Sequence, residues 1–134
     1  MKLASFAGRE AIWATSAAVV VAKAVAVGPV AHADGTYGAI YARPGGPNWA
    51  ISLGQPTPAK AEDRAMVSCN HIACDKKLAF TDCGALAQRG FDYYAASGPT
   101  QPAAESAALA GLPDSSIATS GCNGSSPREE NFRS

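Results

Sequence analysis

The sequence predicts an α+β fold in which two strand-strand-helix-strand repeats form one small domain, with the helices packed on a mainly antiparallel sheet. Short segments of alternating apolar residues, separated by turns rich in glycine and proline, indicate the strands. Two alanine-rich segments, each following a threonine that can cap a helix, indicate the helices. The segments occur in the same order in both halves of the chain, which predicts an internal repeat.

The N-terminal part of the chain has the features of a signal peptide. Basic residues precede an apolar run over residues 11–22, and residues 31–33 (AHA) have the small-x-small pattern that signal peptidase recognises. Lys23 ends the run before it reaches the roughly 20 residues that a membrane-spanning helix needs. We therefore predict a cleaved signal peptide over residues 1–33, a secreted or envelope-located mature chain, and no stable membrane insertion.

Composition limits the partners of the mature chain. The sequence has 47% hydrophobic and 16% charged residues, which is typical of a globular protein. Removing residues 1–33 takes away three basic residues and one acidic residue, which leaves 8 basic and 10 acidic residues. Nucleic-acid binding requires a clustered basic surface, so we expect no nucleic-acid partner, and no motif predicts a cofactor.

The first repeat begins with a predicted β-hairpin. Residues 37–42 (YGAIYA) alternate between two faces, residues 43–48 (RPGGPN) form a turn, and residues 49–53 (WAISL) return as a second strand. Trp49, Ile51 and Leu53 share one face of that strand. The hairpin therefore has one strongly apolar face that is suited to a core.

A helix and a third strand complete the first repeat. Thr57 can cap the helix, Pro58 suits its first position, and the helical spacing ends near Cys69. Residues 70–74 form a short loop, and residues 78–81 (LAFT) read as a strand. The order strand, strand, helix, strand thus spans residues 36–83.

The second half repeats this order over residues 84–123. Residues 84–89 resemble residues 38–43, and residues 91–96 take the place of the second strand. Thr100 begins the second helix, and the third strand leads to Cys122. We place a single disulfide-linked domain at residues 34–123. The polar segment 124–134 (GSSPREENFRS) lacks periodicity and is predicted to be a flexible tail.

The four cysteines predict two disulfides. Export places them in an oxidising compartment, where an even number of cysteines indicates a disulfide framework. The second repeat has Leu112 and Pro113 where the first has Cys69 and Cys74, so both cysteines of that loop are missing together. Two residues that disappear together are most simply partners. We therefore predict the pairs Cys69–Cys74 and Cys83–Cys122, the second joining the ends of the two third strands.

Catalytic and metal sites are weaker interpretations of the same residues. Cys69, His71 and Cys74 could hold zinc, but their spacing is not that of a zinc finger and oxidation competes for the thiols. A serine hydrolase would need His71 as its base, and no Gly-x-Ser-x-Gly motif accompanies it. Glu62 and Glu105 could be an acid–base pair, although carboxylates are also favoured near helix N-termini. We predict a protein that is not an enzyme.

Two groups of residues are candidates for partner binding. The loop between Cys69 and Cys74 would be held in one conformation and would present polar and apolar side chains. The hairpin aromatics could form a ligand patch, or they could pack in the core. The candidate residues are Asn70, His71, Ile72, Tyr37, Tyr41 and Trp49.

Several of these segments resemble a known family. They are YGAIYARPGGPNWAISLG, the threonine-capped helix ending at Cys69, Cys74 itself, and FTDCGALA. Together, over residues 37–123, they are similar to the domain of unknown function 4189 family of small exported bacterial proteins, common in actinobacteria. The resemblance implies export and a small disulfide-bonded α+β domain, and it supplies no catalytic residue.

The leading functional hypothesis is an exported, non-catalytic domain that binds a protein or a cell-envelope component. The alternative is a secreted inhibitor or immunity-type protein that presents the loop between Cys69 and Cys74. A third hypothesis is a small hydrolase or metal enzyme that uses His71.

Overall fold

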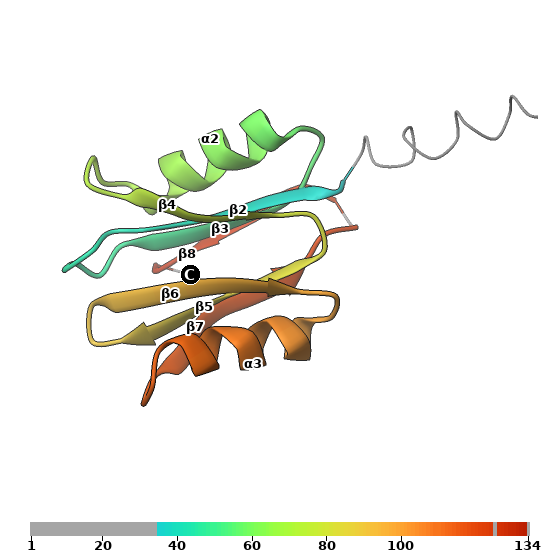
Figure 1. The fold of residues 1–134 in the computed structure, drawn as a ribbon. Coiled ribbons are helices and arrows are strands. Elements are labelled where there is room, and N and C mark those ends of the chain that lie inside the picture. Colours follow the sequence, from blue (N-terminus) through green and yellow to red (C-terminus); the bar gives the residue numbers. More distant parts are fainter. Residues whose placement is uncertain (1–34, 125, 134) are drawn as a thin grey trace, which may run out of the picture. The chain divides into compact units, whose positions relative to one another are not determined.

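Two antiparallel sheets lie face to face, and one helix covers the outer face of each (Figure 1). The computed structural model describes residues 35–124 and 126–133, so the predicted signal peptide lies outside the described residues. The elements are β2 (Tyr37–Ala42), β3 (Trp49–Gln55), α2 (Pro58–Cys69), β4 (Asp75–Phe80), β5 (Cys83–Arg89), β6 (Asp92–Gly98), α3 (Gln101–Gly111), β7 (Ser116–Cys122) and β8 (Arg128–Asn131). The predicted α+β class is confirmed.

The two sheets share a strand arrangement. In the first, with the order β4-β2-β3-β8, β2 lies between the two strands that follow it in the chain. In the second, with the order β6-β5-β7, β5 has the same central place. Across the sandwich β2 lies against β5, β3 against β7, and β4 against β6. Helix α2 packs on β2 and β3, and α3 packs on β5 and β6.

The local signals in the sequence produce the elements that they predict. In the hairpin, Ile40 pairs with Ile51, and both side chains are buried on the face between the sheets. The Thr57 hydroxyl accepts a hydrogen bond from the Lys60 amide at 3.1 Å. Thr100 caps α3 in the same way through the Ala103 amide at 3.2 Å. The hairpin and both helix starts are therefore confirmed.

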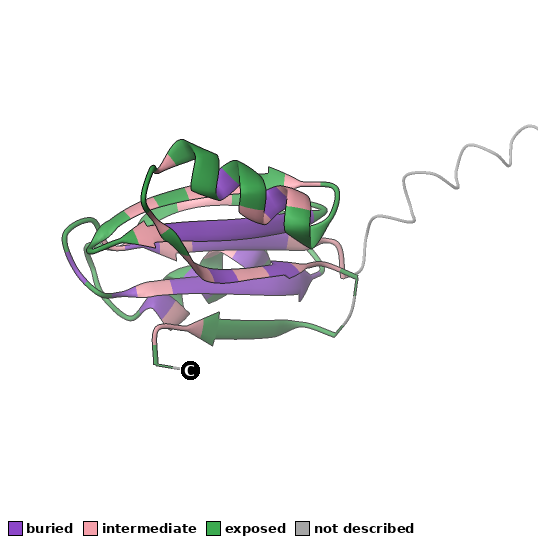
Figure 2. Ribbon diagram, turned by 90° about the horizontal axis from the view of Figure 1, so that it is seen from below, coloured by how far each residue is buried: buried purple, intermediate pink, exposed green. Residues whose placement is uncertain are grey.

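The main core lies between the two sheets, where β2, β3 and β5 are buried along most of their length (Figure 2). The Phe80 ring belongs to this core and packs against a glycine of each sheet. A Cβ atom at Gly38 would lie 2.5 Å from this ring, and one at Gly84 would lie 2.7 Å from it. Both glycines are therefore needed for Phe80 to fit between the sheets.

Alanine forms the contact between each helix and its sheet. Ala61 and Ala65 of α2 pack with Ala39, and Ala104 and Ala108 of α3 pack with residues of β5. Small side chains let the helix approach the sheet closely, but each buries little apolar area. Most of the apolar burial therefore comes from the core between the sheets.

Three features differ from the sequence-based expectations. First, the predicted single sheet is wrong: the domain has two sheets, because each helix covers one face and the two remaining apolar faces bury each other. Second, the segment predicted as a flexible tail contains β8, which pairs with β3, for example through Ile51 and Glu130. Its charged side chains have no apolar alternation, so the sequence pattern did not indicate a strand.

The third difference concerns the place of the second disulfide. Cys83 is the first residue of β5, so it belongs to the second half rather than to the end of the first. It pairs in register with Cys122 of β7, the neighbouring strand of the same sheet. The bridge therefore lies within the second sheet and does not join the ends of the two third strands.

Candidate functional site

The loop of residues 70–73 projects from the end of α2, and the Cys69–Cys74 disulfide closes it. The two Cα atoms of this bridge are 6.4 Å apart. Asn70 ends the helix in the left-handed conformation, with a φ of 59°. The His71 ring Nδ1 accepts a hydrogen bond from the Ala73 amide at 2.9 Å, and its carbonyl accepts one from the Cys74 amide at 3.1 Å. The loop is therefore held by both covalent and hydrogen bonds.

The base of the loop is fixed to other parts of the domain. Cys69 is fully buried, and its carbonyl accepts a hydrogen bond from the Asn48 side-chain amide at 3.0 Å. The neighbouring carbonyl of Ser68 accepts one from the Asn131 side chain of β8 at 2.8 Å. The hairpin turn and the C-terminal strand thus hold the end of α2 from two sides.

Apolar side chains are exposed at this end of the molecule. Ile72 at the tip of the loop is 100% exposed. On the last turns of α2, Val67 is 66% exposed and Met66 is 47% exposed. We call Met66, Val67 and Ile72 the apolar tip. Ile72 thus lies on a loop that is fixed in shape, and the other two apolar side chains lie on the helical turns that lead to it.

The hairpin aromatics do not form a common patch with one another. Tyr37 and Tyr41 lie on the outer face of β2 and pack beside the alanines under α2. Trp49 lies on the opposite face of the first sheet and packs against the core between the sheets. Strand alternation therefore separates these rings, so the three do not share one face, and a binding role for each of them stays a prediction.

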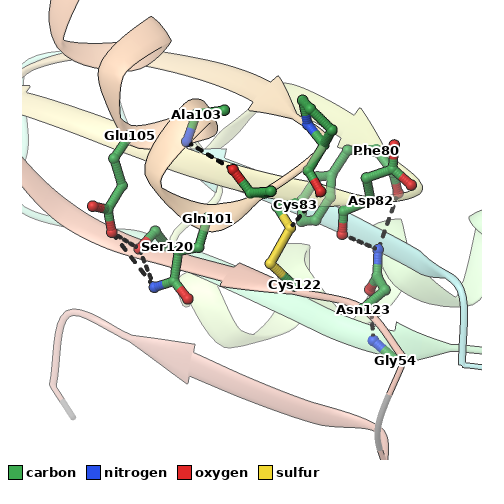
Figure 3. The surroundings of a disulfide bond; sticks show 12 residues. Gly54, Phe80, Asp82, Cys83, Gln101, Ala103, Glu105, Ser120, Cys122 and Asn123 are labelled. Carbon is green, nitrogen blue, oxygen red and sulfur yellow. Dashed lines mark hydrogen bonds between the residues drawn. A yellow bond between two sulfur atoms is a disulfide. The ribbon is translucent and has the colours of Figure 1, made fainter.

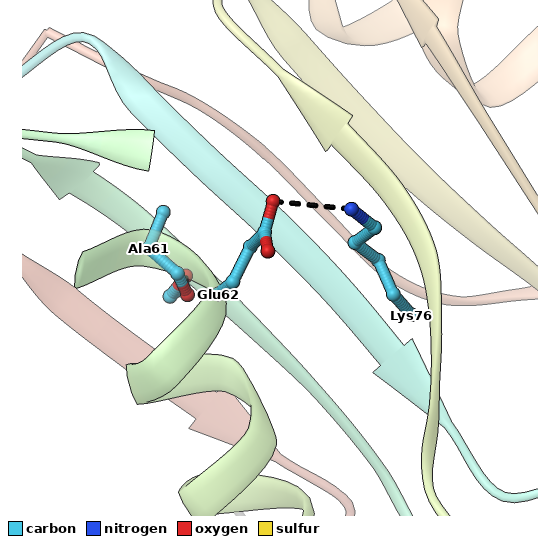
Figure 4. A network of polar contacts seen from close by, with 4 residues as sticks. Ala61, Glu62 and Lys76 are labelled. Atoms are coloured by element: carbon cyan, nitrogen blue, oxygen red, sulfur yellow. Dashed lines mark hydrogen bonds and ion pairs between the residues drawn. The ribbon is translucent and has the colours of Figure 1, made fainter. Parts of the chain in front are cut away.

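The two glutamates proposed as an acid–base pair are also apart. Glu62 of α2 forms an ion pair with Lys76 of β4 at 3.2 Å (Figure 4). Glu105 of α3 accepts hydrogen bonds from Gln101, at 3.4 Å, and from the Ser120 hydroxyl (Figure 3). The helices lie on opposite outer faces of the sandwich (Figure 1), so the two carboxylates cannot act on one substrate atom.

The zinc interpretation requires thiolates that the oxidised loop does not offer. Cys69 and Cys74 are bonded to each other, and a disulfide sulfur is not a zinc ligand. Over residues 35–124 and 126–133, no cluster of three or more histidine, cysteine, aspartate or glutamate side chains is arranged to hold a metal. His71 is an exposed loop residue whose Nδ1 helps to shape the loop.

The second disulfide borders a hollow of about 450 Å³. Its lining includes Asp82, Thr100 and Asn123, together with both bridge cysteines. Asn123 spans the two sheets: its side-chain oxygen accepts a hydrogen bond from the Gly54 amide at 2.8 Å, and its amide donates to the Asp82 carbonyl at 3.4 Å. These contacts give Asn123 a role in holding the sandwich together.

Sequence reasoning missed several residues of the candidate site. Met66 and Val67 could have been found, because the helical spacing that buries Ala61, Ala65 and Cys69 turns them outward. The side chains of Asn48 and Asn131 could not, because their hydrogen bonds depend on contacts between segments far apart in the chain.

The fold and its two bridges define a small disulfide-linked α+β sandwich domain. The family model described as "Domain of unknown function (DUF4189)" matches residues 37–124, and the chain belongs to this family. The resemblance seen in the sequence is therefore confirmed.

The chain is similar to mycobacterial proteins. The chain is 37% identical over 95 residues to "Uncharacterized protein Rv1813c" of Mycobacterium tuberculosis H37Rv, and equally to "Uncharacterized protein Mb1843c" of Mycobacterium bovis. In each case the match covers 71% of this chain and 63% of the relative. The chain also resembles the NMR structure of Rv1813c, with a TM-score of 0.56 and 35% identity over 66% of this chain and 76% of that one.

Two observations bear on the cellular setting. The two disulfides indicate an oxidising environment. In the part of the chain that the structure describes, no helix has the length and apolar character needed to cross a membrane.

Proposed function

We propose that this chain is an exported, non-catalytic binding domain whose apolar tip contacts a protein or a cell-envelope component. One observation carries the proposal: the fully exposed Ile72 stands on a loop that a disulfide closes and hydrogen bonds fix at its base. Export rests on the predicted signal peptide and on the oxidised cysteines.

The physical advantage of such a loop is preorganisation. A mobile loop loses conformational entropy when it binds, at a cost of about 0.5 to 1.5 kcal/mol for each side chain immobilised. The Cys69–Cys74 bridge and the hydrogen bonds of His71 order the backbone before binding. Burying an isoleucine side chain is worth roughly 1.5 to 3 kcal/mol, so Ile72 could contribute a large part of its transfer free energy to affinity.

The test is capture of a partner by the oxidised protein. The bait would be incubated with culture filtrate and with envelope fractions, and the wild type compared with Ile72→Asp. The matched control is Leu109→Asp, because Leu109 is an exposed apolar residue (38%) on α3, the helix on the other side of the sandwich. We expect Ile72→Asp to lose the captured partner and Leu109→Asp to retain it. Equal capture by all three proteins would refute the proposal.

The second candidate is a secreted inhibitor or immunity-type protein. The same protruding loop supports it, because a fixed insert can block a cleft in a target enzyme. In that case the captured partner would be an enzyme that loses its activity at a 1:1 ratio with the bound chain. Alanine substitution of residues 70–73 would restore the activity of the target. A captured partner that keeps its activity would exclude the inhibitor hypothesis and would remain consistent with the binding-domain hypothesis.

We also infer that the two halves arose from one duplicated unit, with its boundary before Cys83. Support comes from the shared strand order and from two register irregularities, at Ile40/Tyr41 in β2 and at Leu86/Ala87 in β5. Each lies two residues beyond a glycine that packs on Phe80. Superposition of the halves in an experimental structure should bring the two irregularities together. A mismatch would argue against duplication.

A further inference from the structure

The edges of the two sheets differ in how they are protected from pairing with another chain. Edge strands usually carry charges, irregularities or covers that prevent such pairing. Strand β4 has Lys76 and Lys77 and a register irregularity, and β8 is short and charged. Strand β7 has a register irregularity, and the Thr119 hydroxyl donates to Glu130 of β8 at 3.4 Å. Each of these three edges therefore has at least one protective feature.

Strand β6 lacks these features. It pairs with β5 in one unbroken register from Asp92 to Gly98, and no strand in the described part of the chain lies on its other side. Between residues 93 and 97 its sequence, YYAAS, contains neither a charge nor a proline. One side of its backbone is thus available for an added strand.

The first sheet shows what an added strand does at the corresponding place. Strand β3 follows the central β2 as β6 follows the central β5, and β8 pairs with the outer edge of β3. With this cover, β3 is buried from Ala50 to Gln55, whereas β6 alternates between exposed and half-buried residues. The second sheet has the same edge without the cover.

The side of the sandwich next to β6 is also incompletely filled. A hollow of about 420 Å³ lies between the ends of β4 and β6, and its lining includes Ala79, Phe80 and Ser97. Tyr93 and Ala95 of β6 contact the core but remain half-buried. An added strand would therefore bury apolar surface as well as satisfy backbone groups.

We propose that β6 pairs with β6 of a second copy of this chain, antiparallel and centred on Ala95, to join two three-stranded sheets into one of six strands. In this register large residues face small ones. Tyr94 faces Ala96 of the partner subunit, and Tyr93 faces Ser97 of the partner subunit. The charged residue Asp92 faces Gly98 of the partner subunit, so no like charges oppose each other.

The same register places a tyrosine of the second copy next to the hollow. Tyr93 and Ser97 lie on the inner face of β6, because side chains alternate and Tyr93 and Ala95 both contact the core between the sheets. The pairing therefore places Tyr93 of the partner subunit beside the hollow that Ser97 helps to line. A twofold axis through Ala95 repeats this arrangement for the other copy.

The test is the concentration dependence of the mass of the purified, oxidised protein in sedimentation equilibrium. We expect a reversible monomer–dimer equilibrium. Ser97→Lys should raise the dissociation constant about tenfold, because a lysine enters the pairing twice in a symmetric dimer. The matched control is Ser116→Lys, since Ser116 is an exposed serine on β7, at the opposite edge of the same sheet. It should leave the dissociation constant unchanged, as should Ser97→Thr.

Amide hydrogen exchange supplies an independent measurement. At high protein concentration the amides of residues 93–97 should exchange more slowly than at low concentration, while those of β7 should not change. Thermal melts would verify that each variant is folded. A protein that stays monomeric at all concentrations, or a dimer that Ser116→Lys weakens as much as Ser97→Lys does, would overturn the proposal.

Discussion

The two halves of the domain use the same strand order but place their disulfides differently. In the first half the bridge lies outside the sheet and closes an exposed loop between α2 and β4. In the second half it joins β5 to β7 within the sheet, with its Cα atoms 4.0 Å apart, and α3 leads to β7 without such a loop. One bridge therefore constrains an exposed loop, whereas the other joins two strands of a sheet.

Removal of the Cys83–Cys122 bridge should have the largest effect on stability. The bridge closes a loop with a sequence separation of 39 residues. In the chain-entropy model this is worth about 4 kcal/mol, because the unfolded chain gains the freedom of a long loop. A Cys83→Ser, Cys122→Ser double variant should lose about that much free energy of unfolding in a urea titration. A loss below about 1 kcal/mol would show that this bridge does not hold the fold.

Removal of the Cys69–Cys74 bridge should cost about half as much. The sequence separation is only 5 residues, which corresponds to about 2 kcal/mol in the same model. The Cys69→Ser, Cys74→Ser variant should stay folded but lose affinity for the captured partner, since the loop would have to be ordered on binding. Hydrogen exchange should localise the change to residues 70–74. Unchanged affinity in this variant would show that partner binding does not depend on the bridge.

Much of this comparison could be predicted from the sequence, because its determinants are local. Strand alternation in residues 37–42 and the threonine caps depend on residues that are close together in the chain. The disulfide pairing could be inferred by comparing the two halves of the sequence, because Leu112 and Pro113 replace the two loop cysteines. These signals indicated the hairpin, the two helices and the disulfide pairing that the structure contains. They did not indicate two sheets, because no local signal determines whether the strands of the two halves pair edge to edge in one sheet or form two sheets that stack.

The support of the candidate site depends on contacts between distant segments. Asn131 reaches the end of α2 only because β8 pairs with β3, and the sequence of β8 has the polar character of a tail. Tyr41 and Trp49 were separated by the opposite faces of one sheet, which the sequence pattern itself implied.

Asn48 tests whether the base of the loop needs its side-chain hydrogen bond. Asn48→Ala removes the donor to the Cys69 carbonyl and leaves a buried acceptor unpaired. Such a loss costs about 1 to 2 kcal/mol. The free energy of unfolding should fall by that amount, and partner affinity should fall with it. As the control in the second sheet, Gln88→Ala, whose side chain bonds Tyr93 at 3.4 Å, should leave partner affinity unchanged.

The smallest expected effect is an alkaline titration that distinguishes the two halves. Burial raises the pKa of Tyr41, and the nearby Glu62 carboxylate raises it further. Burial also raises the pKa of Tyr93 in the second half, where no carboxylate contributes and a hydrogen bond from Gln88 lowers it. Because both groups hold their protons more tightly in the folded state, their contribution to stability is complete below pH 10.0, the ordinary tyrosine value, and is lost as the pH rises through the folded pKa.

A variant can assign this effect to one half. Glu62→Gln removes the carboxylate beside Tyr41 and frees Lys76 from its ion pair, and both changes lower the pKa of Tyr41. Ultraviolet titration of tyrosinate, with Tyr41→Phe and Tyr93→Phe to assign the steps, should show the Tyr41 step moving to lower pH while the Tyr93 step stays in place. If both steps moved together, the two halves would be electrostatically coupled through the core. The separation of Glu62 from the second sheet would then be too small to treat the halves as independent.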